Sequence, residues 1–127
     1  GFGKAAEIAV RDEVKNEERL RALDRLLVDG IKEIPDLSLT NPSEKRLPGI
    51  VSIIVDRKDF NNERFIKKIS GQVALSTGSA CSAGEPSHVI KAIGLEKSVS
   101  KILRITINKF TSKEDIEILL ELLKTNL

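Results

Sequence analysis

Apolar residues near the start of the chain recur at helical spacing. Ala5, Ile8 and Ala9 form one patch. The second patch repeats every three or four residues and consists of Leu20, Leu23, Leu27 and Ile31. The polar interval 11–19 lies between the patches, so the pattern predicts one long helix over residues 4–31 or a bent pair of helices. A proline a few residues further on ends this segment.

Four stretches carry strand patterns. Residues 37–39 and 72–75 predict short strands. The continuous apolar run 50–55, interrupted by a single serine, predicts a strand buried on both faces or under a helix. Residues 102–107 alternate in character, which places Arg104 on the more polar side of a strand.

Two shorter helices are predicted from apolar spacing and end residues. Residues 60–69 place Phe and Ile side chains on one face, with Asn61 or Asn62 as the N-cap. Pro86 presets the backbone for a first helical turn, and the apolar stripe that follows it stops at Gly94.

The last helix begins with a capping-box pattern, Thr111 with Glu114. Its apolar stripe consists of Ile116, Leu119, Leu120 and Leu123. Together the elements predict an α+β fold, in which a small, mostly antiparallel sheet is covered by helices on one face. The length fits a single domain over residues 1–127.

Composition excludes several functional classes. Lys and Arg number 21 against 19 acidic residues, and the two signs are interleaved, so no dedicated nucleic-acid surface is expected. No apolar run approaches the roughly 18 residues of a membrane helix. One Cys rules out an intrachain disulfide, and with no secretory segment a cytoplasmic location is expected. A start at Gly1 within a helical pattern suggests a piece of a longer chain, although removal of an initiator Met would look the same.

The single cysteine, Cys81, lies in a run of small and hydroxylated residues that is too poor in large apolar side chains to be a core element. This run predicts a loop and comprises Ser76, Thr77, Gly78, Ser79, Ala80, Ser82, Ala83 and Gly84. A free Cys is commonly a small buried hydrophobe. In a loop with hydroxyl and backbone donors nearby, however, it is also a candidate nucleophile. Composition leaves both interpretations open.

Two further residues are candidates for chemistry. His88 follows Cys81 closely, but the fold rather than sequence spacing makes a catalytic pair, so we expect His88 to have a surface or packing role. A zinc site needs roughly four ligands and is set aside, because the chain has one Cys and one His. Arg104 is an ion-pair residue, a snorkelling side chain or a bidentate clamp for a carboxylate.

Several segments together carry a family resemblance. STGSAC at 76–81 and PSHV at 86–89 resemble the catalytic segment of the cysteine desulfurases of the nitrogen-fixation and iron-sulfur-cluster type, in the class V aminotransferase family. The segments 1–9, 46–48 and 104–115 are similar to other parts of the same family. The resemblance therefore covers nearly the whole chain.

The resemblance implies a function and roles for residues. Family members use pyridoxal phosphate, held by a lysine of a large domain, to take sulfur from L-cysteine, leaving alanine and an enzyme persulfide. By resemblance Cys81 is the nucleophile and persulfide carrier, and Arg104 binds the substrate carboxylate. The catalytic loop that moves Cys81 comprises Ser76, Thr77, Gly78, Ser79, Ala80, Ser82 and Gly84. Acceptors include iron-sulfur clusters and thiolated tRNA, and full-length members are commonly homodimers.

The sequence departs from the family pattern in three places. The segment SAGE after Cys81 is short, and Asn108-Lys109 replaces a pair that often contains Gly. No segment resembles the cofactor-binding lysine motif. We therefore expect the C-terminal small domain alone, with the helix 4–31 leading to an absent large domain and no activity in isolation. A related selenocysteine lyase or aminotransferase domain and a cofactor-free sulfur carrier or interaction module are the alternatives.

Overall fold

A small antiparallel sheet is at the centre of the computed structural model, which describes residues 1–43, 45–77 and 87–127. The sheet has three strands in the order β1-β2-β3, so β2 has a partner along each edge. The strands are β1 (Leu37–Leu39), β2 (Ile50–Val55) and β3 (Ile102–Thr106). The α+β fold expected from the sequence is confirmed.

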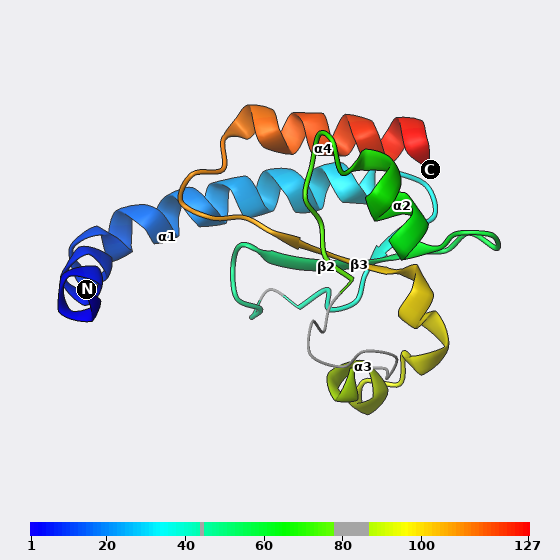
Figure 1. Cartoon of the computed structure of the whole chain (residues 1–127), viewed down its shortest axis with the longest axis horizontal. Coiled ribbons are helices and arrows are strands. Elements are labelled where there is room, and N and C mark those ends of the chain that lie inside the picture. The colour runs from blue at the N-terminus through cyan, green and yellow to red at the C-terminus, as the bar shows by residue number, and fades with distance from the viewer. Residues whose placement is uncertain (44, 78–86) are drawn as a thin grey trace.

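Helices lie on both sides of the sheet (Figure 1). One face is covered by α1 (Phe2–Lys32), α2 (Asn62–Ile69) and α4 (Lys113–Asn126). On the opposite side lies α3 (His88–Ala92), and a 3-10 helix, η1 (Glu96–Lys101), leads from α3 into β3. The position of α3 differs from the expectation of helices on one face only.

The reason for this difference lies at residues 75–77, ahead of the segment that leads to α3. Leu75 packs against the core under the helices, whereas Thr77 lines a pocket on the opposite face of the sheet. Ser76, between them, pairs with β3. The chain therefore passes from one face of the sheet to the other at Ser76.

The core lies under α1 and α4. Alternate residues of β2, Val51, Ile53 and Val55, are at most 1% exposed, whereas Ile50 on the other face is 44% exposed. Of the two alternatives for this strand, β2 therefore lies under helices and is not buried on both faces. Its buried side chains belong to the same core as the stripes of α1 and α4, which comprise Leu23, Leu27, Ile31, Ile116, Leu119, Leu120 and Leu123.

The N-terminal helix is a single element. The alternative of one long helix is confirmed, and Pro35 follows its end at Lys32. All buried residues of α1 lie between Leu23 and Ile31, so only its second half joins the core. No helix in the described ranges is long and apolar enough to cross a membrane.

The expected strand at 72–75 is not formed. The N–H groups of Gln72 and Val73 both donate to the carbonyl of Ile69, at 2.9 and 3.1 Å, and so complete the last turn of α2. These two donors are no longer available to a sheet ladder. The only strand-like pairing in this part of the described chain is the isolated bridge between Ser76 and Arg104.

Two helix caps test the sequence predictions. The side chain of Asn61 accepts from the backbone N–H of Arg64 at 3.0 Å, as predicted. The capping box of α4 is shifted by one residue and is formed by Ser112 with Asp115. Thr111 does not cap the helix, because its hydroxyl accepts from the backbone N–H of Asn108 in the preceding turn.

The two ends of α3 test the prediction of a helix that Pro86 opens and that stops at Gly94. The helix begins at His88, with Ser87 as N-cap residue, and Pro86 lies outside the described residues. Gly94 follows the last turn with φ of +77°, a conformation that favours glycine. The predicted stop at Gly94 is confirmed.

Candidate functional site

Arg104 lies in the middle of β3 and is paired along both edges of the strand. On one side its register partner is Ser52 of β2. On the other side its N–H donates to the carbonyl of Ser76 at 2.7 Å, and the N–H of Ser76 donates to the Arg104 carbonyl at 3.2 Å. Both backbone hydrogen bonds of Arg104 therefore go to Ser76, and together with the register against β2 they fix the origin of its side chain.

Arg104 is half-buried and lines a cavity together with residues of α3, on the face of the sheet that α1 and α4 leave open. Its Nη2 donates to the hydroxyl of Ser76 at 3.3 Å. Within the described residues no carboxylate forms an ion pair with it. A guanidinium carries several further N–H donors in a planar fork, so the ion-pair interpretation finds no support in this part of the chain.

The guanidinium lines a cavity of about 710 Å³. The described residues that form its walls are Thr40, Asn41, Ser52, Thr77, Ser87, Val89, Ile90, Ile93, Ile102 and Arg104. Hydroxyl and amide groups surround the cation on the sheet side, and α3 contributes an apolar wall. Val89 and Ile93 of that wall are 53% and 51% exposed. A wide cavity with one cation among neutral polar groups suits a small anionic ligand with an apolar part.

The structure brings only some of the predicted site residues together. Ser76 and Thr77 lie at Arg104, through the contacts above and the shared cavity. Thr77 and Ser87, which flank the segment 78–86, both line this cavity. The remaining predicted residues lie outside the described residues and are Gly78, Ser79, Ala80, Cys81, Ser82 and Gly84.

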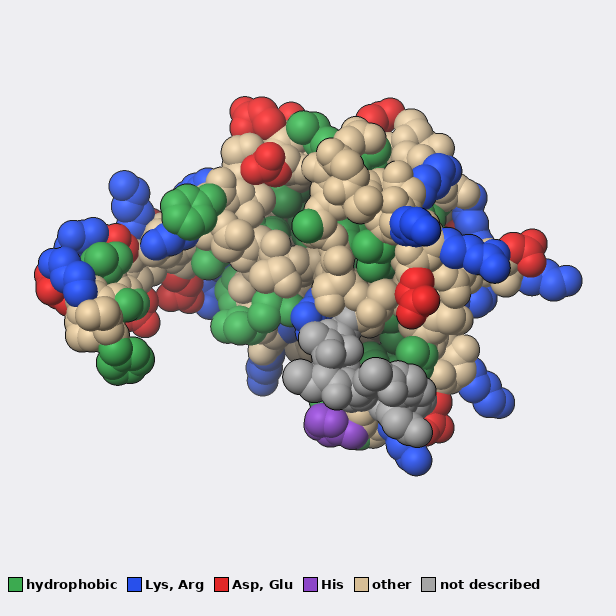
Figure 2. All heavy atoms as spheres, in the orientation of Figure 1, with side chains coloured by type: hydrophobic (Ala, Val, Ile, Leu, Met, Phe, Trp, Pro, Cys, Tyr) green, Lys and Arg blue, Asp and Glu red, His purple; other side chains and the backbone are tan. Residues whose placement is uncertain are grey.

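His88 has a surface position. It is exposed on α3 and does not line the cavity of Arg104. In Figure 2 the histidine, coloured purple, lies at the rim of the molecule. The surface role expected for His88 agrees with this position.

Three polar lining residues on the sheet side of the cavity were not predicted as site residues from the sequence. They are Thr40, Asn41 and Ser52. Thr40 donates its N–H to the carbonyl of Ser52 at 2.9 Å, so the two residues are tied together. The serine that interrupts the apolar run of β2 was the one available signal, because it marks the face of that strand that is not in the core.

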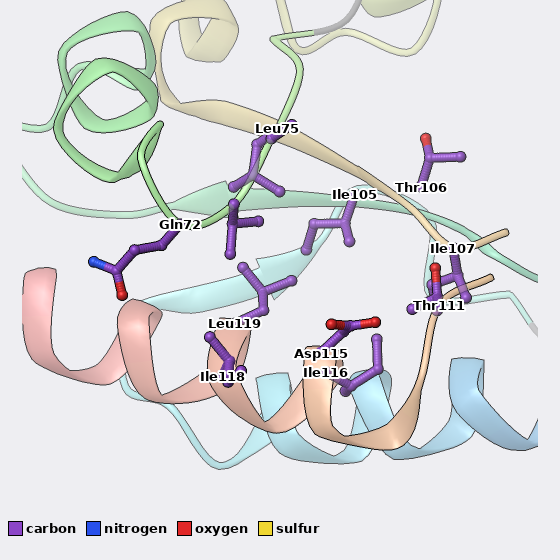
Figure 3. A pocket seen from close by; sticks show the side chains of 12 residues that line it. Gln72, Leu75, Ile105, Thr106, Ile107, Thr111, Asp115, Ile116, Ile118 and Leu119 are labelled. Atoms are coloured by element: carbon purple, nitrogen blue, oxygen red, sulfur yellow. The ribbon is translucent and has the colours of Figure 1, made fainter.

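A second, smaller cavity of about 250 Å³ lies on the other face of the sheet (Figure 3). It is bounded by residues 72–75, β3 and α4, and polar side chains such as Gln72 and Thr111 line it beside aliphatic ones. The carboxylate of Asp115 projects there, but one of its oxygens accepts from the Ser112 N–H at 2.8 Å in the helix cap. We interpret this cavity as a packing gap. No group of three potential metal ligands occurs in the described residues.

Comparisons with known proteins place the chain in a family and its fold in a class. The model of the aminotransferase class-V family matches residues 1–119. The structure of a NifS-like protein from Rickettsia africae superposes with a TM-score of 0.84 at 20% identity, over 98% of this chain and 32% of that one. The α+β architecture is therefore that of NifS-like proteins. The chain belongs to the aminotransferase class-V family.

Two further comparisons bear on function and cofactor. Cysteine desulfurase IscS 1 of Archaeoglobus fulgidus is 35% identical over 97% of this chain and 33% of its own length. The chain thus spans about a third of the curated relatives it matches. A structure of a C-DES mutant with glycine covalently linked to its PLP cofactor superposes with a TM-score of 0.60 at 18% identity, over 84% of this chain and 23% of that one.

The described residues alone do not fit pyridoxal phosphate. Enzymes that use this cofactor hold it through a lysine Schiff base and pair its ring nitrogen with an acidic or basic group. The described lining of the Arg104 cavity contains neither a lysine nor an acidic residue. The groups that would hold the cofactor are therefore not among the described residues that line this cavity.

Proposed function

We propose that residues 1–127 are the small domain of a cysteine desulfurase. In this role Cys81 takes the sulfur of L-cysteine as a persulfide, and L-alanine is the other product. Support comes from the IscS relatives, which match over nearly the whole chain. The observation that carries the proposal is the Arg104 cavity, because Thr77 and Ser87, the described residues on either side of the segment that holds Cys81, both line it.

The reaction balances without an external oxidant. An S–S bond forms between Cys81 and the substrate sulfur as the C–S bond of cysteine breaks, and the carbon gains a proton to give alanine. Arg104 binds the α-carboxylate of the substrate, since the planar guanidinium matches a carboxylate with two parallel N–H···O bonds. The half-buried position of Arg104 strengthens this attraction relative to open water.

The remaining parts of the proposal concern the whole enzyme. Pyridoxal phosphate is held by a large domain, to which α1 leads, and the full-length enzyme is a homodimer in the cytoplasm. Its persulfide is passed to a sulfur-acceptor or scaffold protein, such as one that assembles iron-sulfur clusters. The exposed apolar side chains on the first half of α1 support a contact with further protein, and they include Phe2, Val10 and Val14.

The test is Cys81→Ser in the full-length enzyme that carries this segment. Sulfide release and alanine formation from L-cysteine are expected to fall to background, because a hydroxyl cannot accept sulfur as a persulfide. The visible absorbance of the bound cofactor is expected to stay unchanged. Ser100→Ala, at an exposed position away from the cavity, serves as the control and keeps full activity. Desulfuration that persists in Cys81→Ser would place the nucleophile elsewhere.

A further inference from the structure

Ser76 makes three contacts with Arg104. Two are the backbone hydrogen bonds of the isolated bridge, at 2.7 and 3.2 Å. The third joins the side chains, with Arg104 Nη2 donating to Ser76 Oγ at 3.3 Å. The first two contacts do not depend on which side chain occupies position 76. The third contact does, and it acts on the end of the arginine that faces the cavity.

We propose that Ser76 is a positioning residue whose hydroxyl orients the Arg104 guanidinium for a substrate carboxylate. This inference rests on the proposed function and assigns Ser76 a role in recognition of the substrate. A bidentate contact requires the plane of the guanidinium to be fixed, because both N–H groups must point at the two carboxylate oxygens together. An arginine side chain has many rotamers, and an acceptor at Nη2 selects among them.

The chemistry of the acceptor matters as much as its position. A carboxylate at this point would hold the guanidinium more firmly, but it would also neutralise the charge that attracts an anionic ligand. A hydroxyl is neutral, so it orients the cation and leaves the charge for the ligand. Ser52 and Thr40, on the other side of Arg104 in the sheet, are neutral as well. The described surroundings thus hold the cation without competing with a carboxylate.

The experiment compares Ser76→Thr with Ser76→Val in the full-length enzyme. The two replacements have the same shape and differ in the hydroxyl, so any shared effect of the added methyl group cancels in their ratio. Affinity is measured for L-cysteine and for cysteamine, which lacks the carboxylate, from the change in cofactor absorbance in the Cys81→Ser background. We expect the valine variant to bind L-cysteine about threefold to tenfold more weakly than the threonine variant, the range of one hydrogen bond.

For cysteamine we expect the valine and threonine variants to have about the same dissociation constant, because this ligand has no carboxylate to bind the guanidinium. If the valine and threonine variants bind L-cysteine with nearly equal dissociation constants, the positioning role is overturned. It is also overturned if the valine variant loses the same amount of affinity for both ligands. If the valine variant does not fold, Ser76→Ala replaces it in the comparison with the wild-type serine, under the same criteria.

Arg104→Gln separates this inference from the proposed function. That variant is expected to lose the preference for L-cysteine over cysteamine. Arg104→Gln can lose the preference for L-cysteine over cysteamine while the valine and threonine variants at position 76 bind L-cysteine equally well. In that case the role of Ser76 is wrong and the carboxylate role of Arg104 stands. If the preference survives in Arg104→Gln, the carboxylate role of Arg104 is wrong, and the role of Ser76 is wrong with it.

Discussion

Asp24 joins α1 to the turn before β2 through buried polar contacts. Its carboxylate accepts from Arg46 Nη1 at 2.7 Å and from the backbone N–H of Gly49 at 2.9 Å. The side chains of Arg46 and Asp24 are only 16% and 10% exposed. Gly49 has φ of +84°, and a Cβ there would lie 3.1 Å from the carbonyl of Ile107. The contact therefore fixes a turn that few other residues could adopt.

Removing one partner of the Asp24–Arg46 pair should destabilise the folded chain. Asp24→Ala leaves the partly buried Arg46 guanidinium without its carboxylate and the buried Gly49 N–H without its acceptor, so we expect a loss of about 3 kcal/mol in the free energy of unfolding. Urea denaturation of the chain measures it. The control is Glu17→Ala, which breaks the exposed ion pair with Arg21 and should change stability by less than about 1 kcal/mol. If Asp24→Ala and Glu17→Ala lower the free energy of unfolding equally, the Asp24–Arg46 pair contributes no more than an exposed ion pair.

The sequence predicted the position of some of these residues but none of their side-chain partners. Alternation along 102–107 placed Arg104 on the open face of its strand, and this is confirmed. The contacts of Asp24 with Arg46, and of Arg104 with Ser76, join residues that are far apart in the chain. Local periodicity reports which face a side chain lies on, but not which distant residue the fold brings to it.

At the scale of elements, α4 depends on its N-terminal cap. The hydroxyl of Ser112 accepts from the N–H of Asp115 at 3.1 Å, and the Asp115 carboxylate accepts from the N–H of Ser112 at 2.8 Å. Each contact satisfies a backbone donor at the helix start that has no partner within the helix. Residues 116–123 of the same helix supply several of the buried core side chains, so the cap supports the core as well as the helix.

Ser112→Ala should lower the free energy of unfolding by about 1 kcal/mol, the usual effect of losing an N-cap hydroxyl. Thermal or urea unfolding of the chain measures the change. Ser100→Ala removes an exposed hydroxyl elsewhere and should leave the stability nearly unaltered. A Ser112→Ala variant as stable as wild type would show that the cap does not stabilise α4.

Long elements were predictable because each repeats its pattern over several turns or residues. The helices α1, α2 and α4 and all three strands follow from apolar spacing. The segment 72–75 looked like a strand, but its first N–H groups bond to Ile69 at the end of α2. The shift of the α4 cap by one residue has a similar cause, since Ser and Thr stand side by side and the preceding turn takes the hydroxyl of Thr111. Competition for single hydrogen bonds is not visible in a hydrophobic pattern.

At the scale of the whole molecule, the two faces of the sheet have different roles. The face under α1 and α4 is packed with aliphatic side chains. The other face carries Arg104, the cavity and α3. Large apolar side chains also remain exposed away from both faces, including Phe2 at 90% and Phe110 at 81%. In this arrangement the helices supply stability, and the open face is available for chemistry.

The 127-residue chain on its own is expected to bind no pyridoxal phosphate and to release no alanine from L-cysteine. The physical reason is the described lining of the Arg104 cavity, which lacks the lysine that anchors this cofactor. Visible absorbance after incubation with the cofactor, together with an assay for alanine, measures both properties. The full-length enzyme under the same conditions is the positive control. Alanine production by the isolated chain would contradict the proposal that a large domain is needed.

The bridge between Ser76 and Arg104 has a consequence for protein engineering. Ser76 pairs with β3, and Ser87 is the N-cap residue of α3, so a described element holds the chain on each side of the segment 78–86. We therefore expect that segments of other lengths and sequences, grafted between these two points, leave the strand that carries Arg104 unchanged. Under the proposed function, we expect such grafts to change the delivery of sulfur by Cys81 and to leave the contact of Arg104 with the substrate carboxylate unchanged.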